Sequence, residues 1–119
     1  MAYDAGRKQT VLYGGNTGDT QTWLWDGTNW TANNTSSNPG ILSQATRMAY
    51  DATLGLVVLY GGVDENGRTW TWDGTAWTLL TLATAAPSVS NHAMAYDDHV
   101  KKTISFGGEA LQNGGFVTI

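Results

Sequence analysis

The stretch MAYDATLGLVVLYGGVDENGRTWTWDGTAWT, residues 48–78, decides the fold. Residues 1–31 repeat it with 18 of 31 positions identical, and the tetrapeptide Met-Ala-Tyr-Asp begins at residues 1, 48 and 94. A sustained period of 46 or 47 residues indicates one supersecondary unit copied along the chain. The sequence therefore predicts a first repeat at 1–47, a second at 48–93 and a partial third at 94–119.

Each repeat contains a short apolar run that is closed by two glycines. Runs of β-branched and aromatic residues bounded by turn residues predict β-strands. The second copy is apolar on both faces, as is typical of a strand covered on both sides. These strands are expected at 9–13, 56–60 and 102–106, and the closing residues are Tyr13, Gly14, Gly15, Tyr60, Gly61, Gly62, Phe106, Gly107 and Gly108.

A Trp-rich hairpin follows in the first two repeats. In 69–72 every second residue is Trp, so both indoles are expected on one face of the strand. The Asp-Gly pair that follows is typical of a hairpin turn. With the Met-Ala-Tyr-Asp strand, a repeat is predicted to form four antiparallel strands. The residues 32–43 and 79–90 predict loops between repeats.

Repeated aromatic and acidic positions favour structural roles over chemistry. Large aromatic residues dominate core burial, so we expect the tryptophans to pack in the core or between repeats, with sugar stacking as the alternative. Repeated aspartates are expected to accept hydrogen bonds from the backbone of turns. The tryptophans are Trp23, Trp25, Trp30, Trp70, Trp72 and Trp77, and the aspartates are Asp4, Asp26, Asp51, Asp73 and Asp97.

Four strands in every 46 or 47 residues match the arithmetic of a β-propeller blade. The Gly-Gly strand, the Trp-x-Trp-Asp strand and the following Trp resemble kelch repeats, and 91–97 resembles the strand that opens a kelch blade. The resemblance implies an all-β fold of kelch-type β-propeller blades. The repeats are similar to kelch-type arrays in bacterial secreted or surface proteins. It therefore implies an extracellular or cell-surface location. It also implies that His92 makes a structural hydrogen bond to a neighbouring loop.

The number of repeats predicts an incomplete propeller. Propellers contain typically 4–8 blades, whereas this sequence contains about two and a half. The third repeat is expected to contain its first two strands and part of the third. Two alternatives remain open at this point: the chain is a fragment of a larger propeller, or copies complete one another by homo-oligomerisation through exposed blade edges.

Composition excludes several classes of function. The chain has 119 residues, a net charge of −4 and six scattered Lys and Arg residues, which argues against nucleic-acid binding. No run of 18 apolar residues predicts membrane insertion. There is no Cys, and no nucleophile elbow or phosphate-binding glycine loop. We therefore expect no catalytic, cofactor or metal site and no enzyme activity.

The repeats differ most in the loops after their second strands, at 16–21, 63–68 and 109–114. Strand order places these loops at the same end as the connections between repeats. Variable loops on a rigid framework commonly carry recognition, so we expect a binding or scaffold module for a protein or glycan partner. The candidate ligand-binding residues are Asn16, Asp19, Asp64, Asn66, Arg68, Glu109 and Asn113.

Overall fold

The computed structural model describes residues 1–15, 18–42, 45–62, 67–84, 86–112 and 115–118. Within these ranges the chain forms thirteen β-strands and no helix, so the predicted all-β class is confirmed. None of the described segments is a helix of the length and apolar character that crossing a membrane requires.

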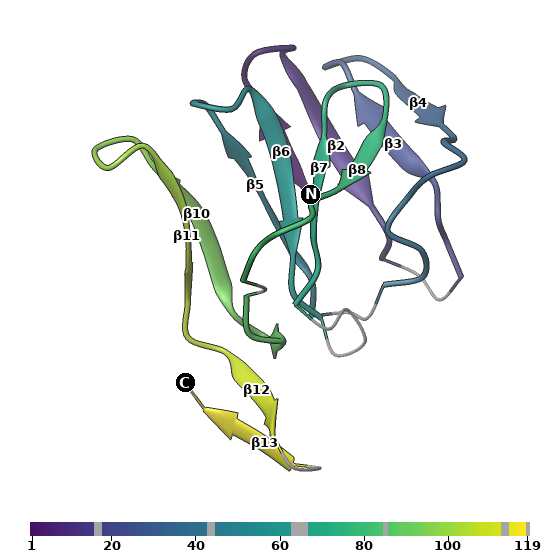
Figure 1. Ribbon diagram of the computed structural model, residues 1–119. Coiled ribbons are helices and arrows are strands. Elements are labelled where there is room, and N and C mark those ends of the chain that lie inside the picture. Colours follow the sequence, from purple (N-terminus) through teal and green to yellow (C-terminus); the bar gives the residue numbers. More distant parts are fainter. Residues whose placement is uncertain (16–17, 43–44, 63–66, 85, 113–114, 119) are drawn as a thin grey trace.

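Two four-stranded antiparallel sheets account for the first two repeats (Figure 1). Neither sheet closes on itself, and the described strands form no ring. Both sheets use consecutive strands in sequence order, as the repeat pattern predicted. Sheet 1 consists of β1 (Ala2–Asp4), β2 (Gln9–Tyr13), β3 (Thr22–Trp25) and β4 (Trp30–Asn33), and sheet 2 of β5 (Arg47–Asp51), β6 (Leu56–Tyr60), β7 (Thr69–Trp72) and β8 (Trp77–Leu79).

The third repeat departs from this plan. Strands β10 (Ala93–Asp97) and β11 (Lys102–Phe106) form a hairpin, but β13 (Gly115–Thr118) pairs with β12 (Glu109–Gln112) and not with β11. β12 also pairs with β9 (Val89–Ser90). The loops predicted at 109–114 and 79–90 therefore each contain a strand. Residues 115–118 lack the Trp-x-Trp of the other repeats, so they cannot make the indole packing that β7 makes in the core.

The core lies between the facing surfaces of sheets 1 and 2. Trp72 and Trp77 of sheet 2 are buried in one cluster with Val11 and Tyr13 of sheet 1. The Trp77 indole N–H donates a 2.8 Å hydrogen bond to Thr22 Oγ1, and its ring meets Tyr13 edge-on at 5.3 Å between centroids. Four of the five residues of β6 are buried, which confirms that this strand is covered on both faces.

Aspartate side chains fix the turns, as predicted. Asp51 Oδ1 accepts hydrogen bonds of 3.0 Å from the backbone N–H groups of Thr53 and Leu54. The hairpin turns contain four residues, and in each of them the Asp side chain accepts two bonds from later N–H groups. These bonds lower the pKa values of Asp26 and Asp73. Side-chain bonds to turn backbone explain why Asp recurs at these positions.

Arg7, which is partly exposed, pairs with the buried Asp4 of sheet 1 and bonds to sheet 2, and this gives a testable prediction. Asp4 is fully buried, and Arg7 Nη1 donates to Asp4 Oδ2 at 2.9 Å and to Gly55 O at 3.0 Å. We expect Arg7→Met to lower the unfolding free energy by about 1–3 kcal/mol, because the buried carboxylate loses its cation. Urea unfolding measures this. The control Lys101→Met breaks the exposed pair with Asp98 and should change stability by less than about 0.5 kcal/mol. Equal effects of the two variants would contradict a structural role for Arg7.

Candidate functional site

Two tyrosines fasten the connections between repeats to the ends of the sheets. Tyr13 Oη lies 2.8 Å from Gly40 O, and the Tyr60 hydroxyl donates to Pro87 O. The connections after β4 and β8 therefore lie against the ends of β2 and β6. This places them beside the loops that follow those strands, as strand order predicted. We call this end of the sheets the loop end.

Close backbone packing reinforces the loop end of sheet 2. Gly62 N donates a 2.8 Å hydrogen bond to Val89 O. Gly67 has a φ of +73°, and a Cβ at this position would overlap the carbonyl group of Ala86. Only glycine fits such a position without strain. The segment that leads to Arg68 is thereby held against the connection at residues 86–89.

The structure places three of the seven candidate ligand-binding residues. Asp19 is half-buried and its Oδ1 accepts a 2.8 Å bond from Gln21 N, so this carboxylate stabilises its own turn. Arg68 is exposed immediately before β7, and Glu109 is exposed at the start of β12, opposite Ser90. In the described part of the chain no hydrogen bond or ion pair joins these three side chains. Asn16, Asp64, Asn66 and Asn113 lie outside the described residues.

A hollow of about 370 Å³ opens at the loop end between sheet 2 and the β10–β11 hairpin. Tyr60, Pro87 and Val89 line one side, and Ser105 and Phe106 line the other. Most of these side chains are apolar. The repeat pattern marked Tyr60 and Phe106 as structural positions, but it did not indicate that they border a hollow, because the hollow depends on where residues 86–89 lie.

His92 is a packing residue in this structure. Its side chain is almost fully buried, and its ring meets that of Tyr60 edge-on at 5.2 Å. A Cβ on Gly61 or on Gly108 would collide with it. Neither ring nitrogen has a hydrogen-bond partner among the described residues, so within them the bond implied by the kelch resemblance is not found. The imidazole instead fills the space beside Gly61, and Gly108 lies against the Cα and Cβ atoms of His92.

The burial of His92 makes stability depend on pH. Burial, together with the positive charge of Arg47, lowers the pKa of His92 below its ordinary value of 6.5. The unfolded chain therefore binds a proton at a pH where the folded chain does not. We expect the unfolding free energy to be constant with respect to this group above about pH 6.5 and to fall as the pH drops toward the folded pKa.

This expectation is tested by unfolding the wild type and His92→Leu in urea from about pH 7.5 to about pH 5. The pKa of the Met1 amino group is also lowered, which gives a slope of the same sign in both proteins. The difference between the two pH profiles isolates His92. Parallel profiles would show that His92 is not held neutral by the fold.

The six tryptophans occupy two kinds of environment. Trp70, Trp72 and Trp77 of sheet 2 are buried, which confirms the predicted core role in the second repeat. Trp30 of sheet 1 is 45% exposed, so it does not pack in the core formed within this chain, and Trp23 and Trp25 are half-buried. The physical reason is that no described strand covers the outer face of sheet 1, whereas sheet 1 covers the equivalent face of sheet 2.

Neither a metal-binding cluster in the described residues nor similarity to known proteins indicates a function for this chain. No group of three His, Asp or Glu side chains in the described ranges is arranged to hold a metal ion. Comparison with protein-family models, with curated proteins and with solved structures found no match to this chain. A function must therefore be inferred from the loop end and from the faces of the sheets.

Proposed function

We propose that this chain is a non-catalytic binding module of the kelch-propeller type and that it recognises a protein partner through its loop end. In this proposal its sheets are part of a larger propeller of a secreted or cell-surface protein. Four-stranded antiparallel sheets that recur every 47 residues and stack face to face support this, because such sheets are the building units of propellers.

The observation that carries the binding role is the fastening of the connections by Tyr13 and Tyr60. Binding residues are common on loops that a rigid framework positions. The same hydroxyl contact occurs in both repeats although the connections differ in sequence. The fold therefore offers a constant platform on which the loop sequence varies.

The chemistry of the loop end favours a protein over a glycan. Ile41, Leu79 and Leu82 are exposed on or beside the two connections, and Arg68 is exposed nearby. Apolar side chains with a few arginines are typical of protein interfaces. Tyr13 and Tyr60 are buried, so their rings are not free to stack on a sugar.

The proposal is tested by screening the chain against a displayed random-peptide library and a glycan array. We expect peptide ligands whose affinity falls about tenfold or more in Arg68→Ala. The matched control Lys101→Ala removes an exposed cation at the opposite end of the strands and should leave the affinity unchanged. Glycan ligands alone, or equal losses in both variants, would contradict the proposal.

A further inference from the structure

The interface between sheets 1 and 2 has two unlike halves. Sheet 1 contributes a receiving half, the surface of Val11, Tyr13 and Thr22 against which side chains of sheet 2 pack. Sheet 2 contributes what we call the donating half, the surface whose Trp72 and Trp77 side chains pack against the receiving half. A sheet of this kind therefore offers a donating face on one side and a receiving face on the other.

The contact between sheet 2 and the β10–β11 hairpin pairs the two kinds of face in the same order, with the receiving face on the sheet that comes earlier in the sequence. Val58, Tyr60 and Thr69, the equivalents of the receiving residues in sheet 1, line a cavity of about 210 Å³ opposite Met94 and Thr103 of the hairpin. Side-chain bonds also cross this contact. Thr103 Oγ1 donates to Asp51 Oδ2 at 2.8 Å, and the hydroxyl groups of Thr53 and Tyr96 are 2.7 Å apart.

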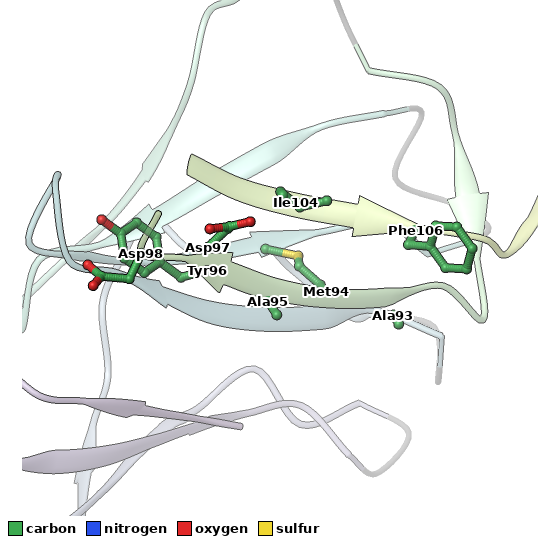
Figure 2. A pocket seen from close by; sticks show the side chains of 8 residues that line it. All are labelled: Ala93, Met94, Ala95, Tyr96, Asp97, Asp98, Ile104 and Phe106. Atoms are coloured by element: carbon green, nitrogen blue, oxygen red, sulfur yellow. The ribbon is translucent and has the colours of Figure 1, made fainter. Parts of the chain in front are cut away.

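This direction leaves a receiving face uncovered on the outer side of the hairpin. Figure 2 shows Ile104 and Phe106 along β11 beside Ala93 and Ala95 on β10. These residues line an open hollow of about 520 Å³, and Phe106 is 79% exposed. In the repeat alignment Ile104 and Phe106 are the equivalents of Val11 and Tyr13.

A donating face is left uncovered on the outer side of sheet 1. Tyr3 is 57% exposed there, and the half-exposed Trp30 lies against Trp25. The Trp25 and Trp30 rings are 5.4 Å apart and tilted by 41°, and those of Trp72 and Trp77 are 5.3 Å apart and tilted by 45°. The Trp25–Trp30 pair on the outer face thus has the same mutual geometry as the Trp72–Trp77 pair, whose Trp77 packs against Tyr13.

We propose that copies of this chain associate head to tail, with the outer face of sheet 1 of one copy seated on the outer face of the β10–β11 hairpin of the next. Trp30 then covers Phe106 as Trp77 covers Tyr13. The occupant is a second copy because both halves of an interface formed within the chain recur, unpaired, on its two outer faces. Contiguous exposed apolar patches commonly mark such contacts, and a contact between unlike faces is heterologous.

This inference rests on the larger propeller of the proposed function, whose further sheets the other copies supply, but it uses the sides of the sheets and not the loop end. Its test is the mass of the 119-residue chain in solution as a function of concentration. We expect the wild type to rise above the monomer mass of 12.8 kDa, and Trp30→Asp and Phe106→Asp each to remain at that mass. Leu54→Asp changes an exposed leucine in a turn of sheet 2 and should associate as the wild type does.

Mixing the two non-associating variants tests the direction of the contact. Trp30→Asp keeps an intact receiving face and Phe106→Asp keeps an intact donating face. A one-to-one mixture should therefore form a dimer of twice the monomer mass and no larger species, because each dimer has one intact contact. Far-UV spectra check that the variants fold, and Tyr3→Asp replaces Trp30→Asp if the latter does not.

Three outcomes would overturn the proposal: a wild type that stays monomeric at all concentrations, variants that associate as the wild type does, or a mixture that fails to dimerise. A monomeric wild type would leave the loop-end proposal intact. Absence of peptide binding together with the expected association would contradict the loop-end proposal and leave the head-to-tail proposal intact. The two proposals can therefore fail independently.

Discussion

Replacing Trp72 with alanine is expected to lower the unfolding free energy by about 3–5 kcal/mol. Trp72 has no solvent exposure and packs between sheets 1 and 2 beside Trp77. Removing the indole leaves a cavity at the centre of the main core cluster, which includes Val57. The indole N–H has no hydrogen-bond partner among the described residues, so the loss is one of packing.

The control is Trp25→Ala, which makes the same change at the equivalent position of sheet 1. Trp25 is half-buried, so we expect a cost of about 1–2 kcal/mol, because less apolar surface is withdrawn from water. Urea unfolding of both variants measures the difference. Equal costs would contradict the view that sheet 1 covers the face of sheet 2 that carries Trp72.

Gly61→Ala is expected to destabilise the chain for two reasons that add. Gly61 has a φ of +88°, and a left-handed backbone costs a residue with a side chain about 1–3 kcal/mol. The new Cβ would also overlap the His92 ring and lie 2.9 Å from Val89 O. Overpacking of this kind costs about 1–3 kcal/mol, so we expect about 2–6 kcal/mol in total.

Gly14→Ala separates the two contributions. Gly14 is the equivalent residue of the first repeat and has a φ of +71°, but a Cβ there would meet only Leu42, at 3.9 Å. We expect it to cost about 1–3 kcal/mol, from backbone strain alone. Thermal or urea unfolding of the two variants decides the matter. A Gly14 variant as unstable as the Gly61 variant would mean that His92 does not fill the space above Gly61.

The strands of the repeats were predictable because their signals are local. The apolar runs at 9–13, 56–60 and 102–106 coincide with β2, β6 and β11. Glycines with positive φ follow each of them. Alternation of Thr and Trp in 69–72 placed both indoles on one face, and Trp70 and Trp72 do share the core cluster.

Features that depend on distant residues were not predictable. β9 is a two-residue strand that pairs only with β12, nineteen residues further along the sequence from Ser90 to Glu109. The exposure of Trp30 depends on whether another sheet covers the outer face of sheet 1. The repeat pattern does not show this, because Trp30 and Trp77 occupy equivalent positions in it. The packing of His92 depends on Gly61 and Gly108, which follow different strands and lie 47 residues apart in the sequence.

The contacts that build the loop end were not predictable from the sequence, and its use as a binding site stays a prediction. Strand order alone placed the loops and the connections at one end of the sheets, and the hydrogen bond from Tyr60 to Pro87 is consistent with that. The hydrogen bonds from the Tyr13 and Tyr60 hydroxyl groups to the connections were not predicted, because the position of these residues in the repeat also fits simple core packing. A tyrosine rather than phenylalanine at both positions was the only available signal.

The packing of Trp77 on sheet 1 underlies both the stacking of the two sheets and the identity of the two exposed faces. Nuclear Overhauser spectra of the labelled chain test it directly, with the Trp77 indole N–H assigned from a Trp77→Phe variant. We expect cross-peaks from this proton to the side chain of Thr22, whose Oγ1 is 2.8 Å from the indole nitrogen, and to that of Tyr13, whose ring centroid is 5.3 Å from that of Trp77. Cross-peaks confined to residues of sheet 2 would contradict it.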